Sequence, residues 1–149
     1  MKIVNLIISS NKKDNFIAGA NINEIKQLSN KEEIMQKVAR GQNIMNKIAN
    51  LKIPTIALIN GSALGGGMEL ALACKYRLAT NNSKVIMGLP EVNLGILPGF
   101  GGTQRLPLLI GLINSLNLML TGKLINAQKA TDIGLIDGII TLVELDICL

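Results

Sequence analysis

Two glutamates occupy glycine-dense apolar segments of the chain. Glu69 lies within residues 61–70, which include three consecutive glycines, and Glu91 lies within residues 88–99. Glutamate is rarely buried without a partner, because burial disfavours its charged form. If both carboxyl groups face one cavity, their pKa values can separate, so that one acts as an acid and the other as a base. The pair therefore predicts proton-transfer chemistry.

The glycine run 65–67 comes just before a predicted helix. Glycine lets the backbone approach a ligand closely, and the first N–H groups of a helix point outward with the positive end of its dipole. No lysine follows as in a phosphate-binding loop, and the dinucleotide fingerprint is missing. We expect one donor for a developing oxyanion here and a second from the turn of small residues 18–20. Helix packing alone remains the alternative explanation of the glycines.

A second glycine-rich run, residues 99–103, also leads into a predicted helix. Two interpretations remain open for it. It is either a wall of the same cavity, placed beside Glu91, or a mobile loop followed by a helix cap at Thr103.

Composition excludes several classes of function. The 149 residues are 48% hydrophobic and 2% aromatic, with no histidine and a net charge of +5 that is spread along the chain. Catalysis and metal sites that need imidazole are ruled out, and the low aromatic content argues against base stacking on single-stranded nucleic acid. Cys74 and Cys148 lack metal-ligand spacing, and Cys74 is expected in the core. We expect a soluble, cytoplasmic protein that binds no metal, nucleic acid or membrane.

Strands and helices alternate along the chain, which predicts an α/β fold with parallel strands. The expected strands are residues 2–9, 55–59, 76–79, 85–87 and 136–140. The expected helices lie within residues 29–53, 66–75, 101–110, 112–120 and 126–131. Predicted helix caps are Asn21 for a short helix, Asn126 for the last one, and a capping box of Ser29 and Glu32 for the long one. That long helix shows an apolar face formed by Ile34, Val38, Gly41, Met45 and Ile48.

Three segments carry a family resemblance: 16–22, 61–70 and 88–106. Together they resemble the crotonase (enoyl-CoA hydratase/isomerase) superfamily, and particularly the hydratase domain of bacterial fatty-acid oxidation complex α subunits. The similarity runs from about residue 4 to residue 145. It implies an α/β spiral of ββα units, with residues 1–149 forming a partial domain that lacks the opening strands and the C-terminal helices.

The resemblance implies hydration of trans-2-enoyl-CoA to 3-hydroxyacyl-CoA in fatty-acid β-oxidation. By similarity, the N–H groups of Ala20 and Gly66 hold the thioester oxygen as an enolate forms. Glu69 and Glu91 match the two family carboxylates, Glu69 as the base toward water and Glu91 as the proton donor to C2.

Further positions match substrate-binding residues of the family. Ala18 and Ile22 correspond to the coenzyme A nucleotide site, with Gly19 in the same turn, and Gly99 corresponds to a backbone position near the attacking water. No separate cofactor is implied, since coenzyme A belongs to the substrate. The implied partners are an acyl-CoA and either further copies of the chain or other fatty-acid oxidation subunits. Asn21 stands where the family usually has aspartate.

Two other functions remain open. One is isomerisation of 3-enoyl-CoA, which needs the same oxyanion hole and a carboxylate to shuttle the proton. The other is a non-catalytic piece of the multifunctional α subunit, left by gene decay or by a split gene.

Overall fold

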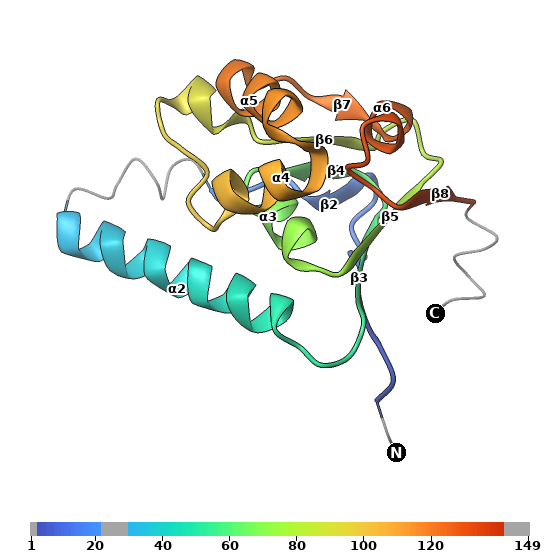
Figure 1. Ribbon diagram of the computed structural model, residues 1–149, viewed down its shortest axis with the longest axis horizontal. Coiled ribbons are helices and arrows are strands. Elements are labelled where there is room, and N and C mark those ends of the chain that lie inside the picture. The colour runs from blue at the N-terminus through green and yellow to red at the C-terminus, as the bar shows by residue number, and fades with distance from the viewer. Residues whose placement is uncertain (1–2, 22–29, 142–149) are drawn as a thin grey trace.

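The computed structural model describes residues 3–21 and 30–141, and its strands form two four-stranded sheets (Figure 1). The first sheet has the order β1-β3-β5-β8, and the second has the order β2-β4-β6-β7. The strands of the first are β1 (Leu6–Ile8), β3 (Thr55–Ile59), β5 (Tyr76–Thr80) and β8 (Gly138–Ile140). Those of the second are β2 (Asn15–Ile17), β4 (Ser62–Leu64), β6 (Ile86–Gly88) and β7 (Ile125–Asn126).

All pairs in the first sheet are parallel, as the sequence predicts. The second sheet is parallel except for its last pair, β6 with β7. Successive strands alternate between the two sheets from β1 to β6, so each step along the chain moves from one sheet to the other. The predicted α/β class and parallel pairing are confirmed, whereas β2, β4 and β7, of two or three residues each, were not among the expected strands.

The expected buried strand at residues 2–9 is wrong in length and in burial. Only Leu6–Ile8 pair with a neighbour, and the side chains of Ile3, Val4 and Leu6 are exposed. The reason is its position: among the strands that the structure describes, β1 lies at the edge of its sheet and pairs with β3 alone. Apolar composition alone does not distinguish such an edge strand from a central one.

The helices are α2 (Lys31–Ala49), α3 (Gly66–Ala73), α4 (Gly102–Ile110), α5 (Leu112–Thr121) and α6 (Ala127–Asp132), with a 3₁₀ helix, η1 (Pro90–Leu94). Helix α3 contacts both α2 and α4, and α4 contacts α5 (Figure 1). Within the described ranges, every helix is too short or too polar to pass through a lipid bilayer. The arrangement places α3 in the middle of the helical layer.

The N-cap of α2 differs from the prediction. Asn30 caps the helix, its side chain accepting from the Glu32 N–H at 2.8 Å, and Ser29 lies outside the described residues. The helix that Asn21 was expected to cap would also lie there. The predicted cap Asn126 is confirmed by its bond from the Lys129 N–H.

The apolar face predicted for α2 is only partly buried. Met45 is buried, whereas Ile34 is exposed. The first turns of α2 extend beyond the sheets, and only its C-terminal part lies along α3 (Figure 1).

The core lies between the sheets and the helical layer and is built almost entirely from aliphatic side chains. Phe16, the one aromatic member, lies on β2 and is 2% exposed. Cys74 is buried among these side chains, as predicted. Glu69 is one of the few polar residues buried there, because α3 carries it into the same interior at 1% exposure.

Candidate active site

Glu69 projects from α3 toward the start of α4. Its Oε1 accepts two backbone hydrogen bonds, from the N–H of Phe100 at 2.7 Å and from the N–H of Gly102 at 2.8 Å. Gly102 opens α4, so the carboxylate lies at the positive end of that helix. Two amide donors and a helix N-terminus favour a charged carboxylate in this position.

These bonds favour one of the two interpretations that the sequence left open. The run 99–103 is not capped by Thr103: the N-cap of α4 is Gly101, at a φ of +105°. The run does form a wall of the carboxylate site, but its bonds go to Glu69 rather than to Glu91, beside which it was expected.

Glu91 reaches the same region from η1. Glu91 is 9% exposed, and its Oε2 is a buried oxygen that has no hydrogen-bond partner among the described residues. Its Oε1 lies 2.9 Å from the place a Cβ would take on Gly65. A larger residue at position 65 would therefore displace the carboxyl group of Glu91 from this place.

The two glycine turns meet at this point. A Cβ on Gly65 would also lie 3.9 Å from the Cα of Gly19. Both glycines have positive φ, +53° and +94°, a region that L side chains rarely adopt. Each immediately precedes a predicted oxyanion donor, Gly66 and Ala20. Gly66 is the first residue of α3, so its N–H has no acceptor within the helix.

The remaining predicted site residues divide into three cases. Ala18 lies in the exposed segment that follows β2, beside Gly19. Gly99 lies in the turn that holds Glu69, and its carbonyl accepts from Gln42 Nε2 at 2.9 Å. Ile22 lies outside the described residues.

Opposing effects act on the acidity of Glu69. Burial raises the pKa of Glu69 above its ordinary value, while the amides of Gly102 and Phe100 and the positive charge of Arg105 lower it. The last three influences all come from the segment that opens α4. The sequence reasoning missed this support, although the glycine run 99–102 was its visible signal.

The pKa of Glu91 is raised by burial, and the negative charge of Glu69 raises it further, against a lowering by its own backbone N–H. This electrostatic coupling means that the two carboxyl groups share one environment. Burial raises the pKa of both groups, but two amides stabilise the charged form of Glu69, whereas the Glu91 Oε2 has no hydrogen-bond partner among the described residues. Such a pair can accept a proton at one oxygen and donate one at another.

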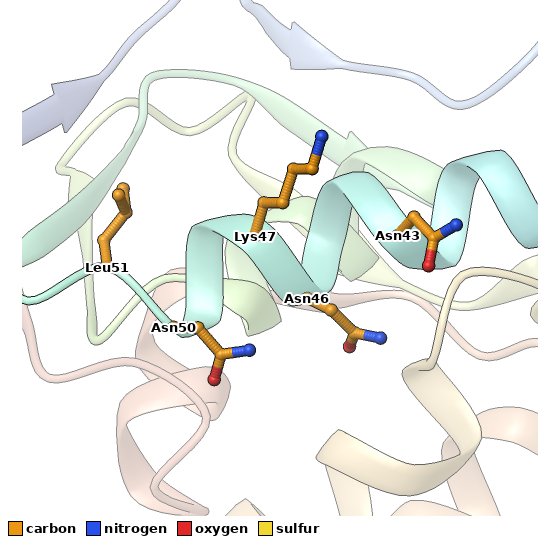
Figure 2. A pocket seen from close by; sticks show the side chains of 5 residues that line it. All are labelled: Asn43, Asn46, Lys47, Asn50 and Leu51. Carbon is orange, nitrogen blue, oxygen red and sulfur yellow. The ribbon is translucent and has the colours of Figure 1, made fainter.

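A surface depression lies elsewhere on the molecule. It measures about 600 Å³ and is lined by Asn43, Asn46, Lys47, Asn50 and Leu51 at the C-terminal end of α2 (Figure 2). Its lining contains no carboxyl group. The glutamate pair, rather than this depression, is the place where proton transfer is possible.

Comparison with known proteins agrees with the motifs. The profile of the family described as enoyl-CoA hydratase/isomerase matches residues 2–146. Fatty acid oxidation complex subunits α from Aliivibrio fischeri and Vibrio cholerae are similar in sequence. The first is 50% identical over 136 residues, which are 91% of this chain and 20% of that protein. The second is 49% identical over 137 residues, which are 92% of this chain and 19% of that protein.

Solved structures are similar in fold. An enoyl-CoA hydratase from Bacillus anthracis superposes with a TM-score of 0.87 at 39% identity, over 95% of this chain and 54% of that one. An enoyl-CoA hydratase from Thermoplasma volcanium gives 0.76 at 36% identity, over 90% and 52%. The chain therefore spans about half the length of these structures and about a fifth of the length of the α subunits.

Proposed function

The chain belongs to the enoyl-CoA hydratase/isomerase family, and from this premise we propose that it hydrates trans-2-enoyl-CoA to 3-hydroxyacyl-CoA in fatty-acid β-oxidation. The observation that carries the proposal is the pair of buried glutamates beside the two glycine turns. Glu69 is held by two amides, and Glu91 keeps an unpartnered oxygen. An acid and a base within one buried site are what the addition of water across a double bond requires.

The proposed first step is attack of water on C3 of the enoyl chain. Glu69 accepts the proton of the water at Oε2, since both amide bonds hold its Oε1. The electrons of the double bond move toward the thioester carbonyl, whose oxygen becomes negative. The N–H groups of Ala20 and Gly66 are assigned to this oxygen, because each follows a glycine with positive φ at the meeting point of the two turns.

The proposed second step is protonation at C2. Glu91 supplies this proton from its unpartnered Oε2, and the carbonyl re-forms as the charge leaves the oxygen. A proton then passes from Glu69 to Glu91, which restores both groups. The net change is addition of one water to the double bond, and neither a metal nor an electron carrier takes part in it.

The substrate class and the partners are part of the same proposal. The similar α subunits are subunits of a fatty acid oxidation complex, and the profile and the solved structures are named for enoyl-CoA chemistry. We accordingly assign an acyl-CoA substrate to this chain and other fatty-acid oxidation subunits as its protein partners. Ala18, Gly19 and Ile22 are assigned to the coenzyme A portion, and Gly99 to the water.

The direct test is hydration of crotonyl-CoA by the purified chain, followed as loss of the conjugated enoyl absorbance. The reference is the double variant Glu69→Gln/Glu91→Gln, in which amide groups of the same shape replace both acids. Activity no higher than that of this variant would overturn the hydratase proposal and would favour the non-catalytic alternative.

Isomerisation of 3-enoyl-CoA is the second candidate activity. The family name covers both reactions, and a raised pKa at Glu91 suits a carboxyl group that moves a proton between two carbons. A 3-enoyl-CoA substrate assayed beside the 2-enoyl substrate separates the two. Faster appearance of the conjugated absorbance from the 3-enoyl compound than its loss from the 2-enoyl compound would favour the isomerase.

A further inference from the structure

Arg105 occupies an unusual place for a cation. It lies in the first turns of α4 and is half-buried. A positive charge near a helix N-terminus works against the helix dipole, so this position by itself disfavours arginine. The contacts of its guanidinium show what offsets that cost.

The guanidinium folds back over the start of its own helix. Nη1 donates to the carbonyl of Phe100 at 3.0 Å, and Nη2 donates to Asn46 Oδ1 at 2.6 Å. A Cβ on Gly101 would overlap Nη1, so the glycine leaves the room that this conformation needs. Both polar backbone groups of Phe100 are therefore engaged, its N–H by Glu69 and its carbonyl by Arg105.

The same turn is held from α2 at further points. Gln42 donates to the carbonyl of Gly99, and the backbone of Gly41 lies so close to the Phe100 ring that a Cβ there would overlap it. Asn46 and Asn50 project to one side of α2, and Lys47 projects to the other (Figure 2). Asn46 is the residue on that side through which Arg105 connects α4 to α2.

We propose that Arg105 is a positioning residue for Glu69: it fixes the turn 99–102 so that the amides of Phe100 and Gly102 stay on the carboxylate, and it anchors that turn to α2 through Asn46. The inference rests on the proposed function, since it concerns the same carboxylate. The positive charge of Arg105 also lowers the pKa of Glu69, which supports the ionised form that a base requires.

The test compares Arg105→Met, which removes the charge and the donors, with Arg105→Lys, which keeps the charge. The first readout is titration of the Glu69 carboxyl by carbon NMR, with Glu69→Gln used to assign its resonance. We expect Arg105→Met to raise the pKa of Glu69 and Arg105→Lys to restore most of the difference. The matched control is Lys47→Met, which removes a cation from the neighbouring face of α2 and should leave this titration unchanged.

The second readout is steady-state kinetics of hydration. We expect Arg105→Met to lower kcat by roughly 10- to 100-fold while KM changes little. We also expect the acidic limb of its pH–rate profile to move to higher pH. Asn46→Ala removes only the link to α2 and should give a smaller loss in kcat. Circular dichroism establishes that each variant is folded; if Arg105→Met is not, Arg105→Lys and Asn46→Ala decide the question.

Two results would overturn the inference. One is a folded Arg105→Met variant with an unchanged Glu69 titration and unchanged kcat. The other is an equal shift in Lys47→Met, which would mean that overall charge is responsible. Inactivity of the unmodified chain would count against the proposed function alone, because the carboxyl titration still reports whether Arg105 controls Glu69.

Discussion

Two regions of this molecule bury an ionisable side chain, and they do so in opposite ways. Arg77, on β5, is 5% exposed and donates to the carbonyls of Leu135 at 3.0 Å and Cys74 at 2.7 Å, while its Nη2 lies 3.2 Å from Asp137 Oδ2. Glu91 is nearly as buried, yet its Oε2 has no partner. The first region satisfies its charge within the protein, and the second leaves an oxygen unsatisfied.

This difference separates a structural role from a chemical one. Burial lowers the pKa of Arg77, and the charge of Asp137 opposes this lowering, so the ion pair offsets part of the cost of burying the guanidinium. At Glu91, burial raises the pKa, and the negative charge of Glu69 raises it further. A buried polar group without a hydrogen-bond partner in the protein lowers the stability of the fold. Such groups are common at functional sites, where a ligand or water supplies the missing partner.

The largest effect is expected from the unsatisfied region. Glu69→Gln and Glu91→Gln should each lower the turnover of enoyl-CoA by about 10²- to 10⁴-fold, the usual contribution of a positioned acid or base. Steady-state kinetics with crotonyl-CoA measures this. Glu33→Gln, an exposed change on α2, is the matched control and should retain full turnover. Equal turnover in all three variants would remove the glutamate pair from the chemistry.

The satisfied region should instead respond in stability. Arg77→Met removes the donors of two buried carbonyls and the partner of Asp137, and we expect the free energy of unfolding to fall by about 3 kcal/mol. Urea denaturation followed by circular dichroism provides the measurement. Arg40→Met, at an exposed position of α2, should change it by less than about 0.5 kcal/mol. A similar small change in Arg77→Met would mean that its network contributes nothing to the fold.

Glu91→Gln should behave in the opposite sense from Arg77→Met. Since Glu91 has an unpartnered buried oxygen, a neutral amide is expected to leave stability unchanged or to increase it by about 1 kcal/mol at neutral pH. A loss comparable to that of Arg77→Met would contradict the distinction drawn between the two regions.

The pH dependence of stability provides a second comparison between the unmodified chain and Glu91→Gln. A raised pKa in the folded state means that the folded chain binds more protons than the unfolded one in the interval above the ordinary value of 4.5. Stability should therefore fall as the pH rises from about 4.5 through the raised values of Glu69 and Glu91. Glu91→Gln should make this slope shallower. Denaturation midpoints measured across that pH interval test this prediction. A steeper fall of stability with pH in Glu91→Gln than in the unmodified chain would contradict it.

The smallest effect should come from a charge pair that is neither buried nor functional. Lys37 and Glu33 lie 3.1 Å apart on the exposed side of α2, one helical turn from each other. Lys37→Ala is expected to change the free energy of unfolding by no more than about 0.5 kcal/mol, and to change it less in high salt. A loss approaching that of Arg77→Met would show that exposure is a poor guide to the energetics of this chain.

Much of the fold could be predicted from local pattern. The strand at residues 55–59, the helices that begin at Gly66 and Leu112, and the cap at Asn126 all follow from rules that act over a few neighbouring residues. Burial of whole elements could not be predicted in this way. β1 is apolar but lies at a sheet edge, and α2 has an apolar stripe of which mainly Met45 is buried.

For the candidate site, the sequence by itself identified Glu69 and Glu91, because a carboxylate in a glycine-rich apolar segment is unusual wherever it occurs. It also placed a glycine before each proposed oxyanion donor. Only the tertiary structure decided that the amides of the turn 99–102 hold Glu69 rather than Glu91, and that Arg105 links this turn to α2. The physical reason is that these bonds join segments distant along the chain, so their partners are set by the packing of α2, α3 and α4.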